Sequence, residues 1–149
     1  MPQYQAPLRD MQFVLHELLE VERELAELPA HAEVNRELID QVLEEGGKFC
    51  GEVLFPLNRS GDEEGCSWSE GAVATPAGFI EAYKTYAEGG WVGVGGDPLF
   101  GGMGMPKVIG AQVEEMVNSA NLSFGLYPML TAGACLALNS HASEELKQK

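Results

Sequence analysis

Basic residues are scarce in this sequence of 149 residues. Lysine and arginine together number 9, against 23 aspartates and glutamates, so the formal net charge is −14 at pH 7. Proteins that bind nucleic acid without regard to sequence need a basic surface that neutralises phosphates, and docking on anionic membranes relies on basic residues as well. The composition therefore excludes most sequence-independent nucleic-acid binding and disfavours docking on a membrane surface.

Cysteine and histidine are too few and too scattered to form a disulfide framework or a metal site. The three cysteines are an odd number and form no CxxC pair, which favours reduced thiols and a cytoplasmic location. We expect Cys50 and Cys135 to be packed in helices. The histidines form neither an HExxH motif nor a Cys/His cluster, so no metal site is expected. These residues are Cys50, Cys66 and Cys135, and His16, His31 and His141.

Long apolar runs and targeting signals are also lacking. No unbroken apolar run approaches the roughly 20 residues of a membrane span, and the start of the chain lacks the charged-then-apolar layout of a signal peptide. We therefore expect no membrane span. The chain stops at EELKQK without a closing element, which indicates that it belongs to a longer protein.

Phosphate-binding motifs are missing even though glycine is abundant at residues 89–104, where eight of the sixteen residues are glycine. Lys107 lies outside a GxxxxGK[ST] frame, and Pro98 stands where a GxGxxG motif needs glycine. The segment predicts a tight loop in which backbones approach closely.

The first half of the chain shows the periodicity of amphipathic helices. Apolar residues recur at three- and four-residue steps from Leu8 to about Leu28, and a second helix is expected from about Ala32 to Leu54. Within it, Gly46-Gly47 either permits close helix packing or marks a bend. Residues 56–75 show no period and predict a long irregular loop that Trp68 anchors on the core.

The second half predicts further helices. Thr75-Pro76 favours a helix start and Gly89-Gly90 its end, while Pro106 begins a helix that reaches about Ala120. Residues 121–142 are almost uncharged and predict a helix buried between others, whose small residues either admit another helix or line a slot for an apolar ligand. Ser143 caps one more helix. The predicted fold class is all-α, an antiparallel bundle of about six helices with one long irregular loop.

Three stretches occur in a specific order. Gly90-Trp91 is followed by PLFGGMGMP, the helix from Val113 to Ala120 is followed by an apolar helix, and the chain closes with SEELKQK. Their order and spacing resemble the N-terminal helical domain of the FAD-dependent acyl-CoA dehydrogenases. Residues 4–15, together with NRSGD at 58–62, resemble a larger branch of that family, which includes methylmercaptopropionyl-CoA dehydrogenase-type enzymes.

The resemblance covers essentially the whole chain and implies its organisation. Residues 1–32 would be an N-terminal extension helix and residues 33–149 the family's N-terminal helical domain. The family's middle β-barrel and C-terminal bundle would be absent from this chain. The family's glutamate base and flavin-contact segments would lie beyond Lys149, so we expect no catalytic residue here and no activity from this chain alone.

The resemblance also implies the chemistry of the full-length enzyme. Such an enzyme would oxidise an acyl-CoA to a trans-2-enoyl-CoA, with a glutamate base taking the α-proton and FAD the β-hydride. Electrons would pass to an electron-transfer flavoprotein. The family favours homo-oligomers, and FAD would be held mainly by the parts that this chain lacks.

Within this chain, the resemblance implies one wall of the acyl pocket on the apolar helix. By register from EELKQK, the residues that line the acyl chain would be Gly125, Met129 and Gly133, with Leu126 and Leu130 as neighbours. The loop that holds Gly101, Gly102 and Gly104 should approach the substrate region without cradling phosphate.

Two other readings remain open at this stage. A stand-alone acidic helical interaction module could bind a partner helix through its apolar stripe, and a stop codon directly after Lys149 would favour it. A relative such as an acyl-CoA oxidase or a divergent non-dehydrogenase member would differ from a dehydrogenase only in sequence beyond this chain.

Overall fold

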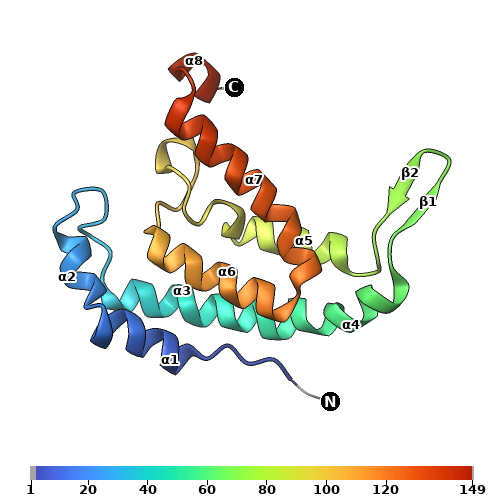
Figure 1. Ribbon diagram of the computed structural model, residues 1–149, viewed down its shortest axis with the longest axis horizontal. Coiled ribbons are helices and arrows are strands. Elements are labelled where there is room, and N and C mark those ends of the chain that lie inside the picture. The colour runs from blue at the N-terminus through green and yellow to red at the C-terminus, as the bar shows by residue number, and fades with distance from the viewer. Residues whose placement is uncertain (1–2, 149) are drawn as a thin grey trace.

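The computed structural model describes residues 3–148 and is helical except for one small hairpin (Figure 1). The all-α fold class is therefore confirmed. Helices α3 and α4 form a long rod, on which α1 packs from one side and α6 from another, while α2 contacts η1 and α7 leaves the end of α6 and rises away from the rod. The elements are α1 (Leu8–Gln12), the π-helix η1 (Phe13–Leu18), α2 (Val21–Ala26), α3 (Arg36–Phe49), the π-helix η2 (Cys50–Leu54), α4 (Phe55–Glu64), β1 (Ser67–Ser69), β2 (Ala72–Ala74), α5 (Phe79–Glu88), the 3₁₀ turns η3 (Trp91–Gly93) and η4 (Pro98–Phe100), α6 (Lys107–Ala120), α7 (Leu122–His141) and α8 (Glu144–Lys147).

The predicted irregular loop at residues 56–75 is wrong. Pro56 lies in the first turn of α4, where a missing backbone N–H is tolerated, and the helix continues to Glu64. Strands β1 and β2 then pair in antiparallel register. Trp68 is exposed and does not anchor this segment on the core. The helix expected from Thr75-Pro76 begins only at Phe79.

The single helix expected from Leu8 to Leu28 is broken once, because α1 runs directly into η1, which ends at Leu18, and α2 starts anew at Val21. Glu20 adopts a left-handed conformation with φ of 45°, so the chain changes direction between η1 and α2. The next helix begins at Arg36 and not near Ala32. Its start is fixed by Asn35, whose side-chain oxygen accepts a hydrogen bond from the Leu38 N–H at 3.0 Å. The spacing of the apolar residues predicts neither the turn at Glu20 nor the start of α3 at Arg36.

The glycine pair lets α3 pack closely on α6 at Gly46 and on the N-terminal segment at Gly47. A Cβ atom on Gly46 would lie 3.0 Å from the Met116 Cε atom, and one on Gly47 would lie 3.1 Å from the Ala6 Cβ atom. The helix runs through both glycines without ending, so close packing is the correct reading of the pair. The core around this contact includes Ile39, Leu43, Leu54, Ile109, Val113 and Phe124, all fully or almost fully buried.

Asn121 joins the end of α6, the start of α7 and the rod. Its side chain is fully buried. The Oδ1 atom accepts a hydrogen bond from the Phe124 N–H at 3.0 Å and caps α7, while Nδ2 donates to the Leu54 carbonyl oxygen at 3.2 Å. The oxygen and the nitrogen of this carboxamide are therefore both hydrogen-bonded. The direction in which α7 leaves α6 is fixed relative to the rod.

Helix α7 is buried only over its first two turns. Phe124, Gly125 and Pro128 are buried, and residues 129–141 are exposed. The expectation of a helix buried between others therefore fails in this chain, and Cys135 is exposed where a packed thiol was expected. Phe124 lies among the rings of Phe79, Tyr83, Tyr86 and Tyr127.

The expectation that no apolar segment approaches the length of a membrane span is wrong for α7. It has 20 residues and a mean hydropathy of 1.3, and among the described residues it is the one helix long and apolar enough to cross a membrane. The sequence interrupts its apolar residues with glycine, threonine, asparagine and serine. These interruptions hide its length, but none of them is charged.

Replacing Asn121 tests the joint between α7 and the rod. Asn121→Ala removes the cap of α7 and also the hydrogen bond to the Leu54 carbonyl oxygen, so the free energy of unfolding should fall by about 2 kcal/mol. Asn35→Ala removes a cap of the same type at an exposed helix start and should cost about 1 kcal/mol. Urea unfolding measures both. Equal losses would show that the Leu54 contact contributes nothing.

The buried thiol of Cys50 supplies a pH-dependent test of the core. Burial raises the pKa of Cys50 to about 12 and that of Tyr86 to about 12. The unfolded chain therefore loses these protons at lower pH than the native chain, and stability should fall as the pH rises above about 9. At pH 8, thiol reagents should modify exposed Cys66 and Cys135 readily and Cys50 only on unfolding. Rapid modification of all three cysteines in the folded chain would contradict the placement of Cys50.

Candidate functional site

The five residues predicted for the acyl wall all lie on α7, but they divide between two faces. Leu126, Met129 and Leu130 are 51%, 52% and 74% exposed, and a Cβ atom on Gly133 would meet no atom within 4 Å. Gly125, in contrast, is buried. With 3.6 residues per turn, Leu126, Leu130 and Gly133 share one face of the helix, and Gly125 lies toward the packed side.

Gly125 is a packing residue in this structure. A Cβ atom at this position would overlap the side-chain oxygen of Asn118 on α6, and it would lie 3.5 Å from a methyl group of Val117. The Asn118 carboxamide is held by a hydrogen bond that its Nδ2 donates to the Glu114 carbonyl oxygen at 2.8 Å. Gly125 therefore lets α7 approach α6. The packing interpretation holds for the first turns of α7, and the slot for an apolar ligand further along the helix stays a prediction.

The open face of α7 consists of Leu122, Leu126, Met129, Leu130, Gly133 and Leu136. The large apolar side chains of this group are exposed and recur at three- and four-residue steps. The helix carries no Asp, Glu, Lys or Arg residue. In Figure 1 its later turns stand clear of α6 and of the rod. A continuous exposed apolar strip of this kind marks a surface that binds a ligand or another protein.

The glycine-rich loop is closed by its own backbone. Two of its ladder bonds run from the Met103 N–H to the Gly93 carbonyl oxygen at 2.8 Å and from the Gly104 N–H to the Gly96 carbonyl oxygen at 2.9 Å. A Cβ atom on Gly102 would overlap the backbone of Gly96, so the two backbones touch, as the sequence predicts. Gly101 lies at the exposed tip.

The same loop does not offer its amides to a phosphate. The N–H groups of Gly102 and Met105 donate to the Asp97 and Val94 carbonyl oxygens at 3.0 and 2.9 Å, so four successive amides of residues 102–105 are engaged within the loop. The start of the loop, η3, contacts α7. The loop therefore braces α7, and its amides do not form an anion cradle.

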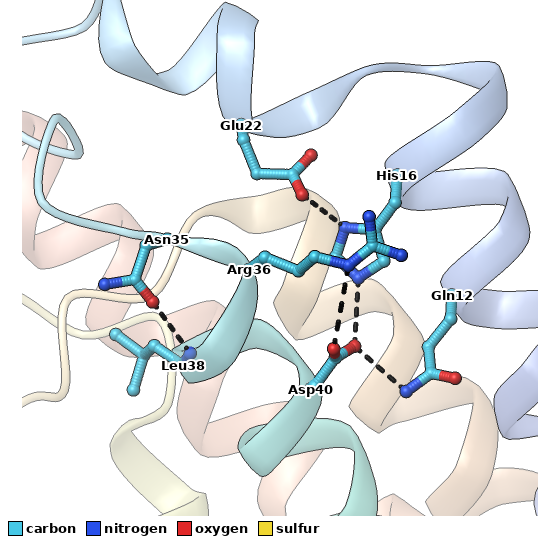
Figure 2. A network of polar contacts seen from close by, with 7 residues as sticks. All are labelled: Gln12, His16, Glu22, Asn35, Arg36, Leu38 and Asp40. Carbon is cyan, nitrogen blue, oxygen red and sulfur yellow. Dashed lines mark hydrogen bonds and ion pairs between the residues drawn. The ribbon is translucent and has the colours of Figure 1, made fainter.

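The buried His16 is the centre of a polar cluster that the sequence did not predict (Figure 2). The His16 side chain is fully enclosed, its Nε2 atom lies 2.9 Å from the Asp40 Oδ1 atom, and its Nδ1 atom lies 2.7 Å from the Glu22 Oε1 atom without the alignment of a hydrogen bond. The Gln12 Nε2 atom donates to the same Asp40 oxygen at 2.9 Å, and Arg36 Nε lies 3.9 Å from the other. Asp40 lies 24 positions away from His16, so no local motif signals the pair.

This cluster fastens the N-terminal helices to α3. His16 comes from η1, Glu22 from α2 and Asp40 from α3, so one ring joins three elements. An enclosed imidazole with a carboxylate at each nitrogen cannot reach a substrate and is not a catalytic base. The two carboxylates lie at opposite ring nitrogens, and the described residues contain no group of three ligands that could hold a metal ion.

Comparison with known proteins decides the family. Residues 40–149 match the family model described as acyl-CoA dehydrogenase, N-terminal domain. The chain belongs to the acyl-CoA dehydrogenase family. It is 42% identical over 144 residues, 97% of its length, to 3-methylmercaptopropionyl-CoA dehydrogenase of Ruegeria pomeroyi, and 35% identical over 149 residues, 98% of its length, to a butyryl-CoA dehydrogenase of Syntrophomonas wolfei. It spans 24% of the length of each of these relatives.

The described residues of this acyl-CoA dehydrogenase domain do not fit a flavin site. The glycine-rich loop uses its amides internally, and the buried polar side-chain atoms without a hydrogen-bond partner belong to His16, His31 and Thr75. His16 lies in η1, His31 in the turns after α2 and Thr75 directly after β2. No role in binding FAD is therefore assigned to them.

Alanine substitutions at the two glycines of α7 test the division of its faces. Gly133→Ala should raise the free energy of unfolding of this chain by about 0.5–1 kcal/mol, because alanine favours the helix and meets no neighbour. Gly125→Ala should gain less or lose stability, because Asn118 must rotate and give up a hydrogen bond worth about 1 kcal/mol. Urea unfolding measures both variants, and equal gains would contradict the packing of Gly125 on Asn118.

Proposed function

We propose that residues 33–149 form the N-terminal helical domain of a full-length FAD-dependent acyl-CoA dehydrogenase, with residues 1–32 as an N-terminal extension. In this proposal the open face of α7 is one wall of the pocket for the acyl chain. The observation that supports it most directly is an exposed, uncharged apolar face, with no atom near Gly133, inside the segment that matches the family.

The part of this domain in the reaction is to bind and shield the alkyl chain. Apolar side chains such as Leu126 and Leu130 would remove methylene groups from water, at about 0.8 kcal/mol for each buried CH₂. Gly133, which follows Leu130 on the same face of α7, would leave room for the chain. The full-length enzyme would convert an acyl-CoA to a trans-2-enoyl-CoA, with FAD as the acceptor of the β-hydride and a base outside this chain as the acceptor of the α-proton. The base and the flavin site belong to the rest of the protein, so the 149-residue chain alone should be inactive.

The charge of this domain limits what else it binds. Its formal net charge of −14 opposes the polyanionic CoA moiety, so CoA is expected to bind mainly elsewhere in the full-length enzyme. The proposal further includes an electron-transfer flavoprotein as the electron acceptor, a homo-oligomeric state and a soluble, cytoplasmic protein. The buried cap at Asn121 and the packed ring of Phe124 support a helix that borders a protein core and does not cross a bilayer.

Filling the space beside Gly133 tests the proposed wall. In the full-length enzyme, Gly133→Leu should lower kcat/KM for long acyl-CoAs more than for short ones, because the added side chain occupies the path of the alkyl chain. Flavin content should stay normal. Cys135→Leu, on the opposite side of the helix, serves as the matched control. Acyl-CoA-dependent dye reduction across chain lengths provides the measurement.

Two outcomes of this assay would count against the proposal. An unchanged ratio of kcat/KM between short and long substrates in Gly133→Leu would remove the acyl wall from this face of α7. A full-length protein that holds FAD but reduces no dye with any acyl-CoA would overturn the proposed activity.

A further inference from the structure

The hairpin of β1 and β2 projects from the domain as a separate arm. In Figure 1 it extends beyond the end of α4 and lies apart from the other elements. All six strand residues are exposed. Each strand has three residues, and an isolated two-stranded hairpin of this size is marginally stable in water. The arm therefore lacks the covering surface that such an element normally needs.

The arm is nevertheless specified by its sequence. Glu70 and Gly71 form the two-residue turn, and both have positive φ, 50° and 82°, as the type I′ turns that suit hairpins require. At the foot, the Ala77 N–H donates a hydrogen bond to the Glu64 Oε2 atom at 3.1 Å. Pro76 beside it is buried. The turn at one end and this hydrogen bond at the other fix the hairpin in one conformation, in which both strands are exposed to solvent.

One face of the arm is apolar. Trp68 and Val73 are cross-strand partners, so their side chains lie on the same face, and they are 72% and 67% exposed. A pair of an aromatic and a β-branched residue contributes only about 0.2–1 kcal/mol to a hairpin. Tryptophan is, however, a residue type enriched at the centre of protein interfaces. The pair fits a small apolar recess on another protein surface.

Charge and chain length indicate which surface that is. Glu70 at the tip and Asp62 near the foot are acidic, in a chain of net charge −14, so nucleic acid, an anionic membrane and a second copy of this acidic domain are all disfavoured. The chain spans 24% of the length of its relatives, which leaves about three quarters of a full-length protein to cover it. The arm and α7 extend to the same side of the rod, so one body can reach both.

We propose that the β1–β2 arm docks onto the remaining part of the same polypeptide in the full-length protein. Trp68 and Val73 enter an apolar recess there, and Glu70 faces basic residues at its rim. The proposal rests on the proposed function in one respect, namely that the full-length protein has the length of its relatives. Docking orders the arm and clamps the end of α4 against the rest of the enzyme.

Hydrogen exchange in the full-length protein tests the docking. The amides of residues 67–74 should exchange at least about tenfold more slowly than an unstructured peptide, including at dilutions where the protein is monomeric. Trp68→Ser should abolish this protection and lower the thermal midpoint. Leu18→Ser, which removes an apolar side chain of similar exposure, 67%, at the other end of the domain, should leave the protection unchanged.

Three results would overturn the assignment. Exchange of residues 67–74 at the unstructured rate in the wild type would show that the arm is uncovered. A smaller molar mass of Trp68→Ser in light scattering, or protection that disappears on dilution, would place the arm on a partner subunit. Dye reduction by the wild-type enzyme is measured separately, so failure of the docking and failure of the proposed function are distinguished.

Discussion

The buried carboxamide of Asn121 is the interaction on which the arrangement of this domain depends. It terminates α6, caps α7 through the Phe124 N–H and bonds the Leu54 carbonyl oxygen of the rod. A buried amide that uses donor and acceptor together costs little, whereas an unpaired one is expensive. The joint is therefore defined in one geometry. Phe124 then enters the aromatic cluster around Tyr86, and the following turns of α7 are directed away from α6.

A helix held at one end in this way presents its other turns to whatever lies beyond the domain. Gly125 brings the first turns onto α6, and the loop around Gly96 and Gly102 braces the helix through η3. From Met129 to His141 every residue is exposed. An apolar strip of this length is unfavourable in water and favourable as the wall of a buried pocket. The same logic of an uncovered apolar surface applies to the arm at Trp68 and Val73.

Sequence patterns predicted the elements whose signals are local. The start of α6 after Pro106, the end of α5 near Gly89 and the capping serine of α8 are all confirmed, and so is the family. The helix break at Glu20, the continuation through Pro56 and the cluster at His16 could not be predicted, because each depends on tertiary contacts or on a backbone choice open to many residues. The domain boundary near residue 33 and the acyl wall stay predictions.

The exposure of α7 shows that the composition of a segment does not by itself predict whether the segment is buried. Residues 121–142 have the composition of a core helix, yet most of them are exposed here. Composition reports the environment of a segment in the complete protein, whereas the structure reports its environment in this chain. The difference between the two is the surface that we assign to the acyl chain and to the rest of the enzyme.

The most direct test of this account is a crystal structure of the full-length protein with a bound acyl-CoA. The account predicts that the alkyl chain lies within about 4 Å of Leu126, Leu130 or Gly133, the contact distance of apolar groups. It is contradicted if this face of α7 is covered by protein side chains and the alkyl chain lies against other helices.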